Sequence, residues 1–112
     1  MNKAVIIGNL VKDPELTQTT SGVAVARFTV AVQRKFKNAD GEYDTDFINC
    51  VAWRQTSEFV NKYFKKGEKI AVSGSIQTRS YDAQDGSKRY VTEIVAEDVE
   101  KLVWSETGAK ES

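Results

Sequence analysis

The chain opens on an apolar run that falls on both faces of an extended strand. In "NKAVIIGNLV" (residues 2–11), Ala4 and Ile6 share one parity, and Val5 and Ile7 share the other. β-Branched residues favour strands, and a strand that is apolar on both faces has to bury both. In so small a chain, we expect the second face to lie against another subunit.

The next apolar segment alternates strictly. In "VAVARFTVAV" (residues 23–32), Phe28 and Val30 lie on one face, whereas Arg27 and Thr29 lie on the other. This alternation predicts a half-buried strand. The preceding "KDPELTQTTSG" (residues 12–22) contains turn-forming residues and is interpreted as a loop.

A hairpin follows, because Asp40-Gly41 is typical of a type I′ turn with positive φ. The returning strand is "DFINCVAWR" (residues 46–54). Its even positions form the expected core face: Ile48, Cys50 and Ala52. Its odd positions form the expected outer face: Phe47, Asn49, Val51 and Trp53. An amide between two large rings suits the stacking of nucleic-acid bases, although packing under a loop or at a dimer interface explains such aromatics equally well.

The segment "TSEFVNKYFKKG" (residues 56–67) has the spacing of an amphipathic helix, with Thr56 or Ser57 as its N-cap and Gly67 at its end. Two more strands follow, joined at Asp85-Gly86. In the first of them, the core parity holds three residues: Ile70, Val72 and Ile76. The outer parity holds three others: Gln77, Arg79 and Tyr81. A guanidinium and a ring on one surface suit phosphate contact and stacking.

The order of these elements predicts an all-β fold. It is a five-stranded antiparallel oligonucleotide/oligosaccharide-binding (OB-fold) barrel, with one helix between strands 3 and 4 and long hairpin arms. Residues 1–104 are expected to form this single domain, and residues 105–112 are expected to be a short, disordered polar tail.

Composition narrows the chemistry. The 112 residues include no histidine, and the single cysteine, Cys50, has no partner for an internal disulfide. The commonest general base and metal ligand are therefore missing, so we expect no catalytic residues, no metal and no cofactor. No apolar run is long enough to span a membrane, which together with the cysteine usage predicts a cytoplasmic protein.

Charge is unevenly distributed. Residues 1–92 hold fourteen Lys and Arg against ten Asp and Glu, whereas residues 93–112 hold two against six. Within the basic part, Phe36 stands in the most charged stretch, next to Lys35 and Lys37. The basic residues near the outer aromatics are the candidate phosphate ligands: Arg34, Lys35, Arg54, Arg79, Lys88 and Arg89.

Five segments in order resemble bacterial and phage single-stranded DNA-binding proteins: "NKAVIIGNLVKDPEL", "GVAVARFTVAV", "DFINCVAWR", "KKGEKIAVSGSIQTRSY" and "RYVTEIVAEDV". The resemblance covers nearly all of residues 1–103. It implies an OB-fold barrel, usually a homotetramer, with the first strand in the dimer contact. It also implies that four aromatic residues stack on DNA bases: Phe36, Phe47, Trp53 and Tyr81. Longer family members end in an acidic tip that recruits replication and repair proteins; "WSETGAKES" holds no such tip, so these partners are not expected here.

We therefore predict a non-enzymatic protein that binds and protects single-stranded DNA without sequence preference, in replication, recombination and repair or in DNA uptake. Asn49 and Gln77 are expected to add polar contacts with the DNA. One alternative is a protein-interaction module on the same barrel, of the primosome accessory type, with weak single-strand binding. Another is a metal-dependent nuclease built on Asp44 and Asp46, which lacks a general base.

Overall fold

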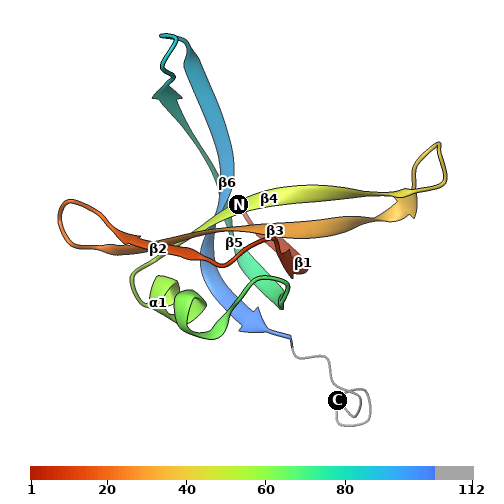
Figure 1. Cartoon of the computed structure of the whole chain (residues 1–112), viewed down its shortest axis with the longest axis horizontal. Helices are drawn as coiled ribbons and strands as arrows, with labels where there is room; N and C mark the ends of the chain where they lie inside the picture. The colour runs from red at the N-terminus through yellow and green to blue at the C-terminus, as the bar shows by residue number, and fades with distance from the viewer. Residues whose placement is uncertain (103–112) are drawn as a thin grey trace.

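We describe residues 1–102 of a computed structural model of the chain, which contains six strands and one helix (Figure 1). The elements follow in the order β1 (Ala4–Leu10), β2 (Glu15–Gln18), β3 (Ala24–Lys37), β4 (Tyr43–Trp53), α1 (Arg54–Tyr63), β5 (Lys69–Asp82) and β6 (Lys88–Lys101). Strands β1, β3, β4, β5 and β6 close a barrel, and the helix lies between its third and fourth strands. The predicted OB-fold architecture is confirmed.

The barrel closes through one pairing that differs from the expectation. The pairings β1–β3, β1–β5, β3–β4 and β5–β6 are antiparallel, but β4 pairs with β6 in parallel, with Cys50 opposite Ile94 and Val51 opposite Val95. The expectation of antiparallel strands throughout was therefore wrong at this one point. The chain between β4 and β6 contains α1 and β5, and such a long connection permits parallel pairing that a hairpin does not.

The segment interpreted as a loop before the second barrel strand contains a short strand. Residues Glu15–Gln18 form β2 and pair with β3, with Leu16 opposite Ala26. All four residues of β2 are exposed. Turn-forming residues at both ends obscured a four-residue strand that has no buried face to impose an alternating pattern.

The core fills the barrel from all five of its strands and from the helix. Its most enclosed large side chains are Val30, Val60, Phe64, Ile70 and Val72. Cys50 and Ala52 are buried as predicted, and Ile48 packs against the same cluster. Ile76 does not match its prediction: it is 46% exposed, because β5 leaves the barrel there and its core-facing parity no longer faces a core.

Helix α1 packs on the barrel through Val60, while Phe64 follows its last turn and is also buried. The predicted cap is wrong, since the N-cap residue is Trp53, which makes no side-chain capping hydrogen bond. Ser57 lies instead within the helix, where its buried hydroxyl donates a hydrogen bond to the carbonyl of Arg54. Arg54 adopts φ 56°, a left-handed conformation uncommon for a residue other than glycine.

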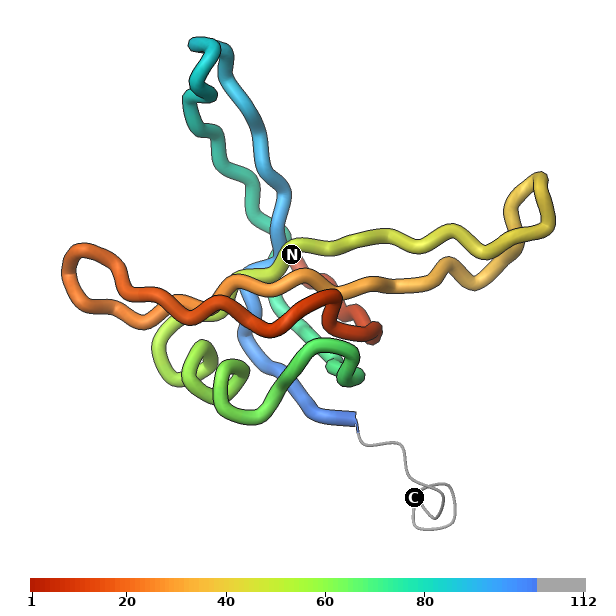
Figure 2. The backbone as a smooth tube through the Cα atoms, in the orientation of Figure 1, coloured from red at the N-terminus to blue at the C-terminus, as the bar shows by residue number. Residues whose placement is uncertain are grey.

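Three hairpins extend from the barrel as arms: β2–β3, β3–β4 and β5–β6 (Figures 1 and 2). The β3–β4 turn is not type I′, because Gly41 has positive φ (81°) whereas Asp40 does not. The amide of Gly41 donates to the carbonyl of Asn38, and the amide of Asn38 donates to Glu42, which describes a three-residue loop with a left-handed glycine.

Candidate nucleic-acid interface

The outer face of β4 carries exposed aromatic residues, as the alternation predicted. Phe47 and Trp53 are 64% and 39% exposed, and the exposed Asn49 lies between them in the sequence. Val51 shares this parity but is buried, with Arg27 and Val95 as its Cα partners in the neighbouring strands. Parity determines the face on which a residue lies, but it does not show how far neighbouring strands cover that face.

An open groove of about 460 Å³ crosses this surface between β3, β4, β5 and β6. Its lining includes six polar or aromatic residues: Arg27, Thr29, Asn49, Arg79, Tyr81 and Glu93. The groove thus brings three predicted site residues together, namely Asn49, Arg79 and Tyr81. Phe36, Phe47 and Trp53 are not part of its lining, so the candidate surface extends along β4 and onto the arms.

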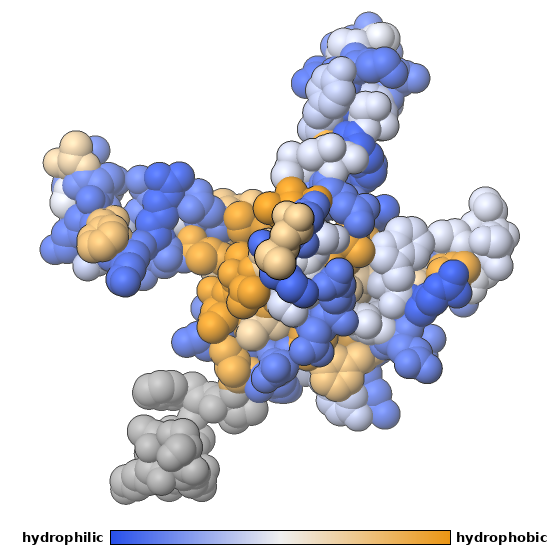
Figure 3. Space-filling view, turned by 180° about the vertical axis from the view of Figure 1, so that it is seen from behind, coloured by the Kyte–Doolittle hydropathy of each residue, from blue (hydrophilic) through white to orange (hydrophobic). Residues whose placement is uncertain are grey.

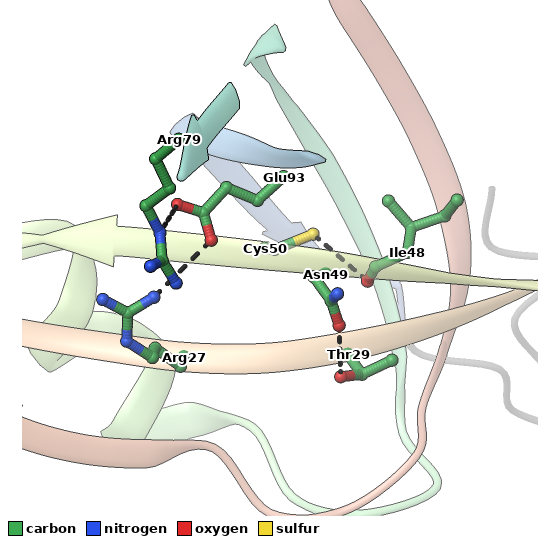
Figure 4. A network of polar contacts seen from close by, with 7 residues as sticks. All are labelled: Arg27, Thr29, Ile48, Asn49, Cys50, Arg79 and Glu93. Carbon is green, nitrogen blue, oxygen red and sulfur yellow. Dashed lines mark hydrogen bonds and ion pairs between the residues drawn. The ribbon is translucent and has the colours of Figure 1, made fainter. Parts of the chain in front are cut away.

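A carboxylate lies between two guanidinium groups in this groove (Figure 4). The Nε of Arg79 donates to one oxygen of Glu93 at 3.2 Å, and the Nη1 of Arg27 lies 3.5 Å from the other oxygen. Arg27 and Glu93 were not predicted from the sequence as site residues. The position of Arg27 on the polar face beside Thr29 was a usable signal for it. Nothing in the local sequence indicates that Glu93 reaches both arginines.

Two predicted polar contacts lie in or next to the groove. Asn49 accepts a hydrogen bond from the hydroxyl of Thr29, its cross-strand partner, at 3.2 Å (Figure 4). That bond fixes the amide and leaves its nitrogen group available as a donor. Gln77 is exposed on β5 and donates to the hydroxyl of Ser75 at 3.4 Å. Gln77 is not among the residues that line the groove.

Phe36 lies on the β3–β4 arm and is 77% exposed. Strict alternation gives it the parity of Val32, which packs against the core, and this parity conflicts with a role at the surface. The structure removes the conflict. Gln33 pairs with Thr45 but Lys37 pairs with Tyr43, so β3 carries two more residues than β4 over this stretch. Two extra residues leave the parity of β3 unchanged across this bulge, but residues 33–37 are all exposed. Beyond the barrel neither face of the arm is covered, so Phe36 reaches solvent despite its parity.

The six candidate phosphate ligands differ in how far acidic neighbours already engage them. Arg34 forms two hydrogen bonds with Asp46. On the β5–β6 arm, Lys88 lies 3.8 Å from Asp82, and Arg89 lies 3.5 Å from Asp85. Ion pairs of Lys35 and Arg54 are not found within residues 1–102.

The β5–β6 arm presents aromatic rings to solvent on both of its faces. Tyr81 pairs with Arg89 across the arm, and the next pair along it is Ser80 with Tyr90. Successive pairs project to opposite faces, so the two tyrosines face away from each other. Tyr81, at 49% exposure, is on the groove side, since it contributes to the lining.

The opposite side of the molecule has a different character. Seen from behind, apolar side chains gather over the barrel, whereas the arms are mainly hydrophilic (Figure 3). Val5 and Ile7 of β1 are 68% and 50% exposed. The second apolar face predicted for this strand is therefore present and uncovered in the single chain. Exposed aliphatic residues in a row are typical of a protein–protein interface.

Chemical reactivity on the described residues is limited. Burial, assisted by the charge of Glu93, raises the pKa of the Cys50 thiol to about 12, so the thiol is protonated near neutral pH. No group of three or more His, Cys, Asp and Glu within residues 1–102 is placed to hold a metal ion. A helix of sufficient length and hydrophobicity to cross a membrane is likewise absent from this part of the chain. The predicted tail, residues 105–112, lies outside it.

Comparison with known proteins gives consistent matches. A family model described as the single-strand binding protein family matches residues 1–102. The chain is 53% identical over 109 residues to single-stranded DNA-binding protein 3 of Listeria innocua, with 97% of this chain and 68% of that protein covered. A Clostridium acetobutylicum relative of the same name is 56% identical, with 93% and 72% covered. A Bacillus cereus single-stranded DNA-binding protein is 53% identical, and the match spans 60% of its length.

Proposed function

Since the chain belongs to the single-strand binding protein family, we propose that it binds single-stranded DNA without sequence preference. The relatives from Listeria, Clostridium and Bacillus carry that activity in their names. By binding exposed strands, the protein would protect them during replication, recombination and repair, or during DNA uptake. We propose that it acts in the cytoplasm, as a binding protein and not as an enzyme.

The observation that carries this proposal is the exposure of four large rings on β3, β4 and β5: Phe36, Phe47, Trp53 and Tyr81. None of the four belongs to an aromatic pair within the described residues, where ring pairs involve Phe59, Tyr63 and Phe64. The Nζ of Lys35 lies 5.9 Å from the centre of the Phe36 ring. An exposed ring that is not stacked on another ring has a face available to a ligand. Base stacking on such rings contributes about 1–3 kcal/mol per base and tolerates any sequence.

The charged groups supply the second half of the proposed binding. We assign phosphate contacts to six residues: Arg34, Lys35, Arg54, Arg79, Lys88 and Arg89. Asn49 and Gln77 are assigned polar contacts with bases or sugars. Arg79 and Asn49 line the groove, and the β3–β4 and β5–β6 arms carry Arg34, Lys35, Lys88 and Arg89. We therefore expect a strand stacked on the rings to pass within reach of these groups. Duplex DNA hides the faces of its bases, so it should bind much more weakly.

We further propose that the chain assembles as a homotetramer through surfaces that include β1. Val5 and Ile7 are exposed there with no covering element from the described chain. The apolar row lies outside the groove lining, so assembly through it would leave the groove open. Each barrel should then cover on the order of 4–16 nucleotides.

The test is a titration of oligo-dT and of a duplex of equal length at two salt concentrations. A Trp104→Phe background leaves Trp53 as the single tryptophan, since the chain has two. We expect quenching of Trp53 fluorescence by oligo-dT, with salt-sensitive affinity well above that for duplex. Equal affinity for the two ligands, or no change in Trp53 emission on binding, would defeat the proposal.

A further inference from the structure

Glu93 is unusual among the acidic residues of the groove because its carboxylate is almost enclosed. Its side chain is 11% exposed, whereas the side chains of Arg27 and Arg79 on either side of it are 48% and 46% exposed. The carboxylate therefore lies beneath the two guanidinium groups, and the guanidinium groups face the solvent in the groove. Glu93 lines the groove, but a ligand that enters it meets much more of the two arginine side chains than of the acid.

The three residues come from separate strands. Arg27 is on β3, Arg79 on β5 and Glu93 on β6, while β4 lies between β3 and β6 in the sheet. Each oxygen of Glu93 engages one arginine (Figure 4). One negative charge is shared by two positive charges, so the cluster has a net charge of +1 and not the +2 that two arginines alone would give.

Net charge matters because phosphate binding by basic residues is an exchange of ions. Each phosphate neutralised on a single strand releases counterions and contributes about −0.7 to the slope of log K against log salt. A carboxylate fixed beside the arginines neutralises part of the positive charge that a phosphate would otherwise neutralise. Glu93 therefore competes with the DNA backbone for Arg27 and Arg79, from a position that the DNA cannot displace easily.

We propose that Arg27 is a further phosphate-contacting residue and that Glu93 is a positioning residue that limits the electrostatic part of binding in the groove. This inference rests on the proposed function. Glu93 holds the two guanidinium groups on the groove floor and reduces their joint charge by one. Binding then depends more on ring stacking, which distinguishes single strands from duplex, and less on phosphate attraction, which does not.

Salt slopes on oligo-dT test this with three variants of near-native shape. Glu93→Gln removes the competing charge, so we expect the slope of log K against log salt to be steeper by about 0.7. The variant should bind more tightly than wild type, and this gain should shrink about threefold between 50 and 200 mM salt. Arg27→Gln leaves Arg79 paired with Glu93 at zero net charge, so we expect a slope flatter by about 0.7. The double variant restores +1 and should recover the wild-type slope.

Glu97→Gln is the matched control, since Glu97 is an acid on the same strand whose ion pair, with Lys3 at 3.1 Å, lies outside the groove lining. Its slope should equal that of wild type. Thermal unfolding identifies the variants that fold, and Arg27→Gln, at a half-exposed position, carries the test if Glu93→Gln does not. Any folded variant that binds oligo-dT but misses its expected slope overturns the inference. Failure of the wild-type chain to prefer single strands instead overturns the proposed function, and the inference with it.

Discussion

Arg34 and Asp46 form a two-pronged ion pair across the base of the β3–β4 arm, with Nε and Nη2 of the arginine each 3.0 Å from a carboxylate oxygen. Phe36 lies two residues beyond Arg34, within the stretch between Gln33 and Lys37 where the strand register shifts. The pair therefore ties β3 to β4 beside the bulged stretch that contains the exposed ring.

This relationship predicts a specific titration. The hydrogen bonds from Arg34, followed by its charge, lower the pKa of Asp46 below its ordinary value. A carboxyl group whose pKa is lower in the folded state stabilises that state above its unfolded pKa, and the contribution disappears as the pH falls through the folded value. The pair should therefore be intact at neutral pH and be lost only in acid.

Carbon-detected NMR of the Asp46 carboxyl group measures this midpoint directly. In the Arg34→Gln variant, we expect the midpoint to rise to the ordinary range for aspartate, because both the hydrogen bonds and the charge are gone. An unchanged midpoint would show that the pair does not persist in solution.

Removing the ring of Trp53 should weaken binding without changing its salt dependence. We expect Trp53→Ala to cost about 1–3 kcal/mol with oligo-dT at every salt concentration, because stacking releases few counterions. Fluorescence anisotropy of a labelled strand measures it. Tyr63→Ala is the control, since this exposed tyrosine on α1 lies outside the proposed surface and should leave affinity unchanged. An unaffected affinity in folded Trp53→Ala would contradict the stacking assignment.

Two glycines should respond differently to the same substitution. A Cβ at Gly8 would collide with the carbonyl oxygen of Ala31, where β1 approaches β3, and backbone atoms cannot move aside cheaply. Gly41 has open space around it but adopts φ 81°. We expect Gly8→Ala to lower the free energy of unfolding by about 1–3 kcal/mol or more, and Gly41→Ala by about 1 kcal/mol. Denaturant unfolding measures both, and the reverse order would contradict the account of the barrel closure.

The thiol of Cys50 should be inert in the native protein. Burial raises its pKa to about 12, so very little thiolate exists near neutral pH. A coloured disulfide reagent should react slowly in native buffer and completely in denaturant. Fast native reaction at neutral pH would mean that the barrel opens readily near β4.

Much of the fold was predictable from alternation and element order. The core positions Cys50 and Ala52 and the exposed positions Phe47 and Trp53 follow from a period of two along one strand. Apolar and polar residues alternate clearly in a strand that buries only one of its faces. This pattern was insufficient for β2, whose four exposed residues leave no alternating trace.

Other features depend on contacts between distant segments, which a local pattern does not contain. The burial of Val51 depends on its two neighbouring strands, and the exposure of Ile76 depends on where β5 leaves the barrel. The exposure of Phe36 likewise depends on where β3 leaves the barrel, since residues 33–37 are all exposed whatever their parity. The link from Glu93 on β6 to Arg27 on β3 passes over the intervening β4, so no spacing in the sequence indicates it.

The three arms end in the same turn. Each turn is a five-residue segment: Thr19–Val23, Asn38–Glu42 or Ala83–Ser87. In each, the amide of the first residue donates to the carbonyl of the fifth, and the amide of the glycine at the fourth position donates to the carbonyl of the first. The glycines have nearly the same φ, at 86°, 81° and 85°. Because the three turns share one backbone conformation, we expect a five-residue segment moved from one arm to another to fit its new strands. The sequence of an arm could then be redesigned without changing the barrel.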